Sequence, residues 1–254
     1  MLQACLNGSR TDAEHPAIPR MPAELAAEGR AAVEAGARVL HLHPYDESGA
    51  ETFAAGPCAA ALKAVRAACP GVPISLSTLD AIEGHPRRLE SIESWTELPE
   101  LVTVNQGEQG TLELCELLSR RGIGIEAGVL ELSDAHRFVE SGLAAGCVRV
   151  LIEPLDPEPA AAVAQAAAME EVLHAAGVQL EQVHHGDGVA TWHVMERAVR
   201  RGHGIRVGLE DTTVLSDGRP AAGNGALVTL AARMLAGEVL GGGRPDVSAG
   251  AGEL

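Results

Sequence analysis

Residues 148–186 read VRVLIEPLDPEPAAAVAQAAAMEEVLHAAGVQLEQVHHG and contain the pattern that decides the fold. A short apolar run at 148–154 predicts a buried strand, and the alanine-rich run at 157–177 predicts a long helix. A second short run at 179–186 predicts another strand. Strands that alternate with helices in this way are typical of a parallel sheet whose faces are covered by helices.

The same alternation extends along the chain in both directions. The other predicted strands are 2–8, 39–44, 73–78, 101–106, 123–129 and 205–211. The other predicted helices are 22–37, 54–70, 86–94, 111–122, 133–142, 191–202 and 223–238. Eight strand–helix units predict a single (β/α)₈ TIM barrel over residues 1–240, followed by a flexible C-terminal tail at 241–254. A doubly wound open sheet is the alternative, but no G-x-G-x-x-G motif follows the first strand.

Composition narrows the classes of partner. Hydrophobic residues make up 46 % of the 254 residues and aromatic residues only 2 %, so that Ala, Val and Leu must fill the core. A formal net charge of −16 disfavours nucleic acid and anionic membranes as partners.

The five cysteines are scattered, without a C-x-x-C pair, which is typical of a reducing compartment. We find neither a signal peptide nor a membrane span, and we expect a cytoplasmic protein.

Polar residues gather where the predicted strands end. In a barrel, functional groups lie at these C-terminal strand ends. The candidates are Asn7, Ser9, Arg10, His41, His43, Ser75, Ser77, Thr78, Thr103, Asn105, Glu108, Glu126, Glu153, His184, His185, Asp187, Arg206, Glu210 and Asp211.

The motif HLH at 41–43 is the strongest sign of a metal site. Strand side chains alternate between faces, so His41 and His43 point the same way and can bind one ion. By the same rule Arg206 and Glu210 share a face of the last strand. In a closed barrel only the first strand separates this last strand from the second strand, which carries the two histidines. Two histidines and one carboxylate are typical of catalytic zinc with an open position. Fe(II), Mn and Co also suit this set, and a hydrogen-bonded core histidine is the alternative at each position.

The doublet His184-His185 is open to two interpretations. It is either a second feature of the site or a partner for a helix cap, and Asp187 nearby has no assigned role.

Several motifs together resemble those of one enzyme family. They are LNGSRT (6–11), PAEL (22–25), HLHPYD (41–46), SLST (75–78), TVN (103–105) and RVGLED (206–211). In this order they resemble the β-keto acid cleavage enzymes, also called 3-keto-5-aminohexanoate cleavage enzymes, over about residues 1–235. The resemblance implies a zinc-dependent TIM barrel, a homotetramer, and cleavage of a β-keto acid with acetyl-CoA. The products would be acetoacetate and a new acyl-CoA.

The resemblance also implies roles for individual residues. His41, His43 and Glu210 match the zinc ligands, and Asp211 and Arg206 match the residues of the acid–base steps. The positions that match or fall near substrate contacts are Ser77, Thr103, Asn105 and Glu126. Asn7 and Arg10, after the first strand, complete the predicted substrate-binding set.

Arg10 marks a departure from the family pattern. The family member that takes an amino-keto acid has an acidic residue in this segment, whereas this chain has GSRT at 8–11. Because a guanidinium pairs with carboxylates and repels ammonium, we expect a substrate whose side chain is neutral or carries a carboxylate. The alternatives to the whole function are a metal-dependent aldolase or lyase that needs no CoA, and a non-catalytic metal-binding barrel.

Overall fold

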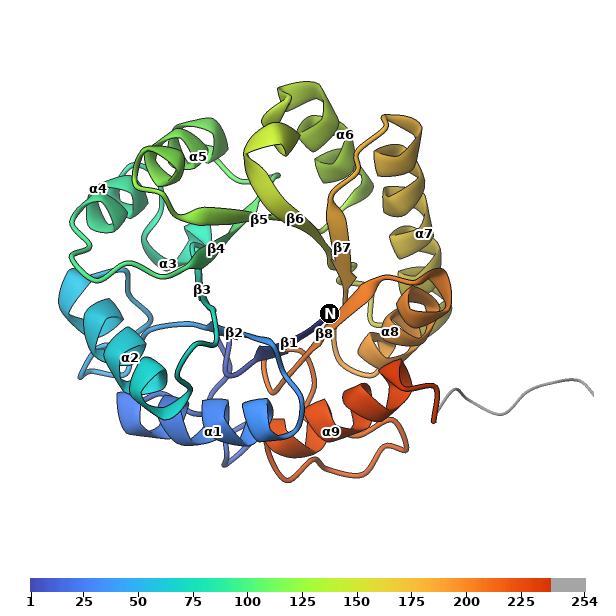
Figure 1. Ribbon diagram of the computed structural model, residues 1–254, viewed down its shortest axis with the longest axis horizontal. Coiled ribbons are helices and arrows are strands. Elements are labelled where there is room, and N and C mark those ends of the chain that lie inside the picture. The colour runs from blue at the N-terminus through green and yellow to red at the C-terminus, as the bar shows by residue number, and fades with distance from the viewer. Residues whose placement is uncertain (239–254) are drawn as a thin grey trace, which may run out of the picture.

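A computed structural model describes residues 1–238 and confirms the predicted TIM barrel. Parallel strands pair in chain order and the last pairs with the first, so that the sheet closes into a ring (Figure 1). The strands are β1 (Leu2–Cys5), β2 (Val39–Leu42), β3 (Ile74–Ser77), β4 (Leu101–Asn105), β5 (Gly124–Val129), β6 (Cys147–Ile152), β7 (Glu181–His184) and β8 (Gly204–Val207). The predicted tail lies outside the described residues.

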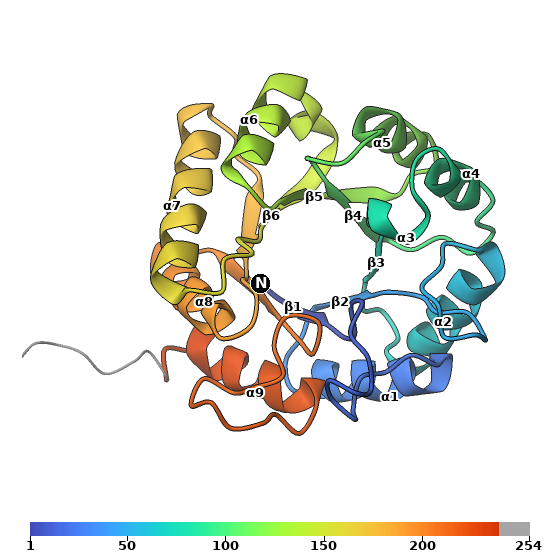
Figure 2. The ribbon, with the colours of Figure 1, turned by 180° about the vertical axis from the view of Figure 1, so that it is seen from behind.

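Helices surround the ring on its outer side, as Figure 1 and Figure 2 show from opposite ends. They are α1 (Pro22–Glu34), α2 (Ala55–Ala68), α3 (Asp80–Glu83), α4 (Arg87–Glu93), α5 (Thr111–Arg120), α6 (Leu132–Ser141), η1 (Leu143–Gly146), α7 (Pro159–Ala175), α8 (Ala190–Arg201) and α9 (Asn224–Leu235). The sequence pattern did not predict α3 and η1, because four residues are too few to show a helical period. No helix within residues 1–238 is long and apolar enough to cross a membrane.

Proline and glutamate residues set where two of the longest helices begin. Pro22 occupies the first turn of α1, and the Glu24 carboxylate accepts hydrogen bonds from the backbone N–H groups of Arg20 and Met21. In α7, Pro159 follows Glu158, whose carboxylate accepts the N–H of Ala161 at 2.8 Å. These caps satisfy N–H groups that have no partner inside the helix.

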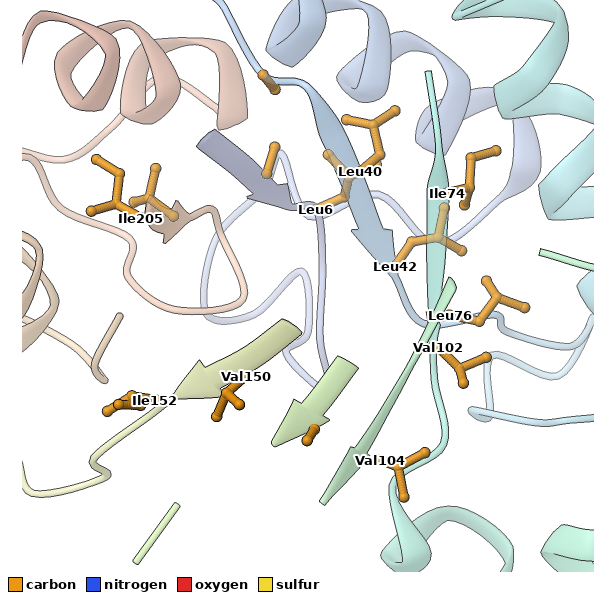
Figure 3. Packing of buried hydrophobic residues seen from close by; sticks show 14 of the residues in the cluster. Leu6, Leu40, Leu42, Ile74, Leu76, Val102, Val104, Val150, Ile152 and Ile205 are labelled. Carbon is orange, nitrogen blue, oxygen red and sulfur yellow. The ribbon is translucent and has the colours of Figure 1, made fainter. Parts of the chain in front are cut away.

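Small and aliphatic side chains form the core, as the composition predicts. Leu, Ile and Val side chains on and next to the strands are buried in this core, and Figure 3 labels members of the cluster such as Leu40, Ile74 and Val102. Packing against α1 is close at Gly29, where a Cβ would lie 3.1 Å from Cδ1 of Leu40 and this side chain would have to shift by a few tenths of an ångström. Both phenylalanines, Phe53 and Phe138, are fully buried.

The chain crosses closely over the end of β1 just after β8. A Cβ on Gly208 would lie 1.8 Å from the carbonyl oxygen of Cys5, so only glycine fits there. The segment between β8 and α9 then runs beside the segment between β1 and α1 (Figure 2), where His15 Nε2 lies 2.9 Å from the carbonyl oxygen of Ala221. This crossing brings residues near 210 over the barrel mouth, beside those that follow β1.

Candidate active site

Two histidines lie at the mouth of the barrel where β2 ends. His41 belongs to the strand, and His43 follows its last residue. Their ring centroids are 5.3 Å apart with the ring planes at 76°. Asn7, at the end of β1, fixes the backbone of His43: its Nδ2 donates to the carbonyl oxygen at 2.8 Å, and its Oδ1 accepts the N–H at 2.9 Å.

Glu210 reaches both histidines from the turn after β8. The expected strand to residue 211 is wrong here, because β8 ends at Val207 and a turn follows in which the N–H of Asp211 donates to the carbonyl oxygen of Gly208. Gly8 makes room for the carboxylate, since a Cβ there would lie 2.5 Å from Cγ of Glu210. One carboxylate oxygen lies 3.7 Å from Nε2 of His41, and the other lies 3.7 Å from Nε2 of His43.

Outer partners orient both rings. Nδ1 of His43 lies 2.5 Å from the Glu51 carboxylate, and Nδ1 of His41 lies 3.2 Å from Oγ of Ser75. The Ser75 hydroxyl donates in turn to Glu126, which is fully buried. We therefore assign the Nδ1 proton to both rings, with each Nε2 facing Glu210. Such carboxylate–histidine partners typically support a metal ligand.

The charges around the site favour a cation. Burial opposes ionisation of Glu210, but Arg206, His41 and His43 outweigh it and hold the pKa of this carboxyl well below its usual range. Burial likewise disfavours the charged form of His43, but Glu210 and Glu51 outweigh it and raise its pKa to about 9. The same carboxylates also attract a metal cation, which competes with the second proton on the His43 ring.

The residues present fit a divalent metal ion. Oε2 of Glu210 is buried and has no hydrogen-bond partner, although it lies beside His41. His41, His43 and Glu210 offer ligand atoms that all lie within 4.8 Å of one another. Two imidazoles and one carboxylate are the donors of catalytic zinc sites that keep an open position. Several divalent metals accept this donor set.

Two further clusters within residues 1–238 have metal-ligand residue types but unsuitable geometry. His184 and His203 stack at 10°, so their in-plane lone pairs cannot meet at one ion, and Arg197 and Arg201 already pair with the adjacent Glu170.

In the other cluster, His185 bridges two carboxylates. Its Nδ1 lies 3.1 Å from Asp211 and its Nε2 lies 3.3 Å from Glu153. Burial disfavours the imidazolium, but Glu153 outweighs it, and the pKa of His185 rises to about 9. A protonated imidazole between two carboxylates needs no metal.

Arg206 joins this cluster to the metal-ligand set. The guanidinium, on β8, donates to the Glu210 carboxylate and lies 3.6 Å from Oδ1 of Asp211. Asp211 is 3 % exposed, and burial raises its pKa although His185 and Arg206 oppose this shift. A buried carboxylate with a raised pKa, held by an arginine and a histidine, is suited to proton transfer.

A cavity of about 230 Å³ opens above these residues. Its lining comprises Gly8, Ser9, His41, His43, Ser77, Leu79, Thr103, Asn105, Leu130, Glu153, Leu155, Arg206 and Glu210. The metal-ligand set therefore faces a space that can hold a small molecule, as an active site requires.

Comparison with known proteins shows the family of this chain. The model of the family described as beta-keto acid cleavage enzyme matches residues 1–239. The chain belongs to this family. A curated relative is the 3-keto-5-aminohexanoate cleavage enzyme of Fusobacterium nucleatum subsp. nucleatum, which is 26 % identical over 262 aligned residues. The match covers 92 % of this chain and 90 % of the relative.

Solved structures with the same fold include complexes of ObcA. The binary complex with oxaloacetate matches with a TM-score of 0.70 and 20 % identity. The ternary complex with a C4-CoA adduct and oxalate gives the same values. The match covers 87 % of this chain but only 64 % of the ObcA chain. The 3-dehydroquinate dehydratase of Aquifex aeolicus VF5 matches with a TM-score of 0.58 and 13 % identity, over 92 % of this chain and 96 % of that one. At such identities the likeness shows the fold alone.

The structure brings together most of the predicted site residues. Ser77, Thr103 and Asn105 line the cavity together with the three ligand candidates and Arg206. Asp211 lies directly behind Arg206 rather than in the lining.

Three predicted substrate contacts lie elsewhere. Both amide atoms of Asn7 are committed to the backbone of His43. Arg10 pairs with Glu14 and Asp187, and it donates to the carbonyl oxygen of Glu210.

Glu126 is the third of these residues. It lies buried beneath the ligand histidines, bonded to Ser75 and Gln3. These contacts give Asn7, Arg10 and Glu126 partners within the protein, and their predicted role in substrate binding stays a prediction.

The sequence analysis did not single out Glu51 or the leucines of the cavity, and it left His185 open between a feature of the site and a partner for a helix cap. Glu51 lies in the loop after β2, eight residues beyond the histidine it contacts, and no strand or helix period marks it. His185 and Glu153 do stand at strand ends, which was the available signal.

Proposed function

We propose that the chain transfers an acyl group from a β-keto acid to CoA, with acetyl-CoA as the second substrate. The carbon–carbon bond between the keto carbon and the methylene breaks, and the acyl group leaves on the CoA sulfur. The methylene carboxylate fragment joins the acetyl carbon, which gives acetoacetate. This function rests on the family, and the observation that supports it most is the His41–His43–Glu210 set beside Arg206 and Asp211.

The metal-ligand set would hold the reacting end of the keto acid. His41, His43 and Glu210 would hold a divalent ion, which would supply Lewis acidity at the ketone oxygen. Ser77 and Thr103 offer hydroxyl groups on the adjacent wall for the carboxylate of the substrate. Zinc as the metal and a homotetramer as the assembly stay predictions, which metal analysis and light scattering test.

Asp211 is the general base in this proposal; it lies just behind the cavity lining in this structure, and catalytic contacts of this kind often tighten only once substrate is bound. Asp211 takes a proton from the methylene group, and the resulting carbanion attacks the acetyl carbon and expels the CoA thiolate. The thiolate then attacks the keto carbon, and the carbanion that leaves takes the proton back from Asp211 to give acetoacetate. Arg206 orients the carboxylate, and His185 links it to Glu153, which lines the cavity. His185 is a positioning residue here, because it acts through Asp211. General base catalysis typically contributes about 10²–10⁴-fold in rate.

Isotope exchange tests the reaction without knowledge of the natural side chain. Acetoacetate is a product with every substrate of this class, so it must also bind as a substrate. With acetyl-CoA labelled in the acetyl group, the reaction transfers label into acetoacetate. We expect exchange in the metal-loaded enzyme and its loss in Asp211→Asn. If no label moves at full metal content, the proposed function is wrong, and cleavage of a keto acid without CoA would favour a lyase.

A further inference from the structure

The cavity has a polar side and an apolar side. His41, His43, Arg206 and Glu210 come from β2, β8 and the turn after β8. The apolar lining consists of three leucines, which follow other strands of the ring: Leu79 after β3, Leu130 after β5 and Leu155 after β6. In a closed ring of eight strands, β5 and β6 lie opposite β1 and β2. Leu130 and Leu155 therefore face the metal-ligand set across the barrel mouth, whereas Leu79 lies on the neighbouring wall beside β2.

Within the described residues, the charged groups of the lining are already paired. Arg206 binds Glu210, and Glu153 faces His185. The neutral amide of Asn105 donates to Glu108. A charged group held against Leu79 and Leu130, which are both partly buried, would lose part of its hydration without gaining a partner, which costs free energy.

Arg10 does not offer a positive charge to a substrate in the cavity. Its guanidinium points to Glu14 and Asp187, both outside the cavity lining, and its Nε donates to a backbone carbonyl. These contacts give no support to our expectation that Arg10 would pair with a carboxylate on the substrate side chain. A neutral side chain remains compatible with the site.

We propose that the β-keto acid carries an unbranched or branched aliphatic acyl chain, and that Leu79, Leu130 and Leu155 contact it. This substrate class rests on the proposed function, since the cavity takes the acyl group that is transferred to CoA. The relative from Fusobacterium is named for an amino-keto acid, so this chain would differ from it in side-chain chemistry. Each methylene buried against leucine should raise kcat/KM about fourfold until the cavity is full.

The test compares kcat/KM across a panel of β-keto acids with acetyl-CoA. The panel holds straight-chain acids of increasing length, a branched acid, 3-oxoadipate and 3-keto-5-aminohexanoate. We expect values to rise with aliphatic length, and the two charged substrates to fall at least tenfold below the best aliphatic one. Preference for either charged substrate would overturn the inference.

A paired substitution tests the leucines themselves. Leu155 is 51 % exposed, so Leu155→Asp should fold, and we expect it to lower kcat/KM for the best aliphatic acid at least tenfold. The same variant should raise kcat/KM for 3-keto-5-aminohexanoate relative to kcat/KM for the best aliphatic acid. Leu112→Asp is the matched control, because Leu112 is 54 % exposed on α5 and does not line the cavity. Equal effects of the two substitutions would contradict the assignment.

Label exchange separates the two proposals. Exchange into acetoacetate together with no aliphatic preference would refute the substrate class and leave the reaction intact. No exchange at full metal content would refute the reaction, and the substrate class with it.

Discussion

Glu51 is the partner through which we test the metal site most directly. Its carboxylate lies 2.5 Å from Nδ1 of His43, while Nε2 of the same ring faces Glu210. Glu51→Gln keeps the size of the side chain and an acceptor oxygen, but it removes the negative charge. The imidazole then becomes a weaker donor to a metal ion, and its orientation is less firmly held. We expect the variant to bind its metal more weakly.

The size of the effect follows from the two outer partners. Loss of such a partner typically lowers metal affinity 10- to 100-fold, which is about 1.4–2.8 kcal/mol. The Glu51 contact is short, and the Glu51 side chain is only 18 % exposed, so water replaces it poorly. Ser75 is a neutral partner at 3.2 Å, and Thr103 lies 3.4 Å from the same nitrogen of His41. Ser75→Ala should therefore cost less affinity than Glu51→Gln.

The assay is a competition between protein and a chromophoric chelator for zinc at neutral pH. His43→Ala is the positive control and should lose the metal. Glu47→Gln is the matched negative control, because Glu47 is an exposed residue of the same loop. Wild-type affinity in Glu51→Gln, alongside loss in His43→Ala, would show that the contact does not support the ligand. A loss of zinc affinity in Glu47→Gln would instead indicate that the negative charge of the whole loop, and not the Glu51 contact, supports the metal.

Three further outcomes can be checked. Asp211→Asn should lower kcat about 10²–10⁴-fold with unchanged metal content, and metal loss would instead make Asp211 part of the metal site. His185→Ala should lower kcat more than it changes KM, and His185→Gln should recover part of the loss because an amide can still donate to Asp211; equal losses would contradict a positioning role. Burial lowers the pKa of His184 to about 3, whereas the unfolded chain takes up this proton near pH 6.5. The unfolded state then binds more protons between these values, so stability should fall by about 1.4 kcal/mol per pH unit as pH drops from 6.5 to 3. Urea unfolding at several pH values should show a shallower loss in His184→Gln, and parallel curves would refute this reasoning.

The sequence predicted the barrel because its signal is repeated. Each strand–helix unit shows its own period, so an error in one unit leaves the ring intact. The shared direction of His41 and His43 could also be predicted, because alternation along β2 is local and regular, and their role as metal ligands stays a prediction. Helix α3 could not be predicted, since a segment of four residues shows no period.

Contacts between loops were beyond the same reasoning. Glu210 was assigned to the right place through a strand that in fact ends at Val207, and the turn at Gly208 carries it to the histidines instead. Asn7 was predicted to bind substrate because it stands at a strand end, yet its amide fixes a neighbouring backbone. Position at a strand end shows which residues can meet, and only the three-dimensional contacts show which atoms are already satisfied.

The ligand set is divided between the two ends of the chain. His41 and His43 follow the first helix, whereas Glu210 is made only after the eighth strand, and β1 lies between them in the ring. A chain still being synthesised therefore holds two ligands but lacks the third until the barrel can close. Metal binding then stabilises only the closed barrel, by about 2.7 kcal/mol when the free metal concentration is 100 times the Kd. A fragment that ends before β8 should bind zinc far more weakly than the full chain, so metal content becomes a readout of completed folding.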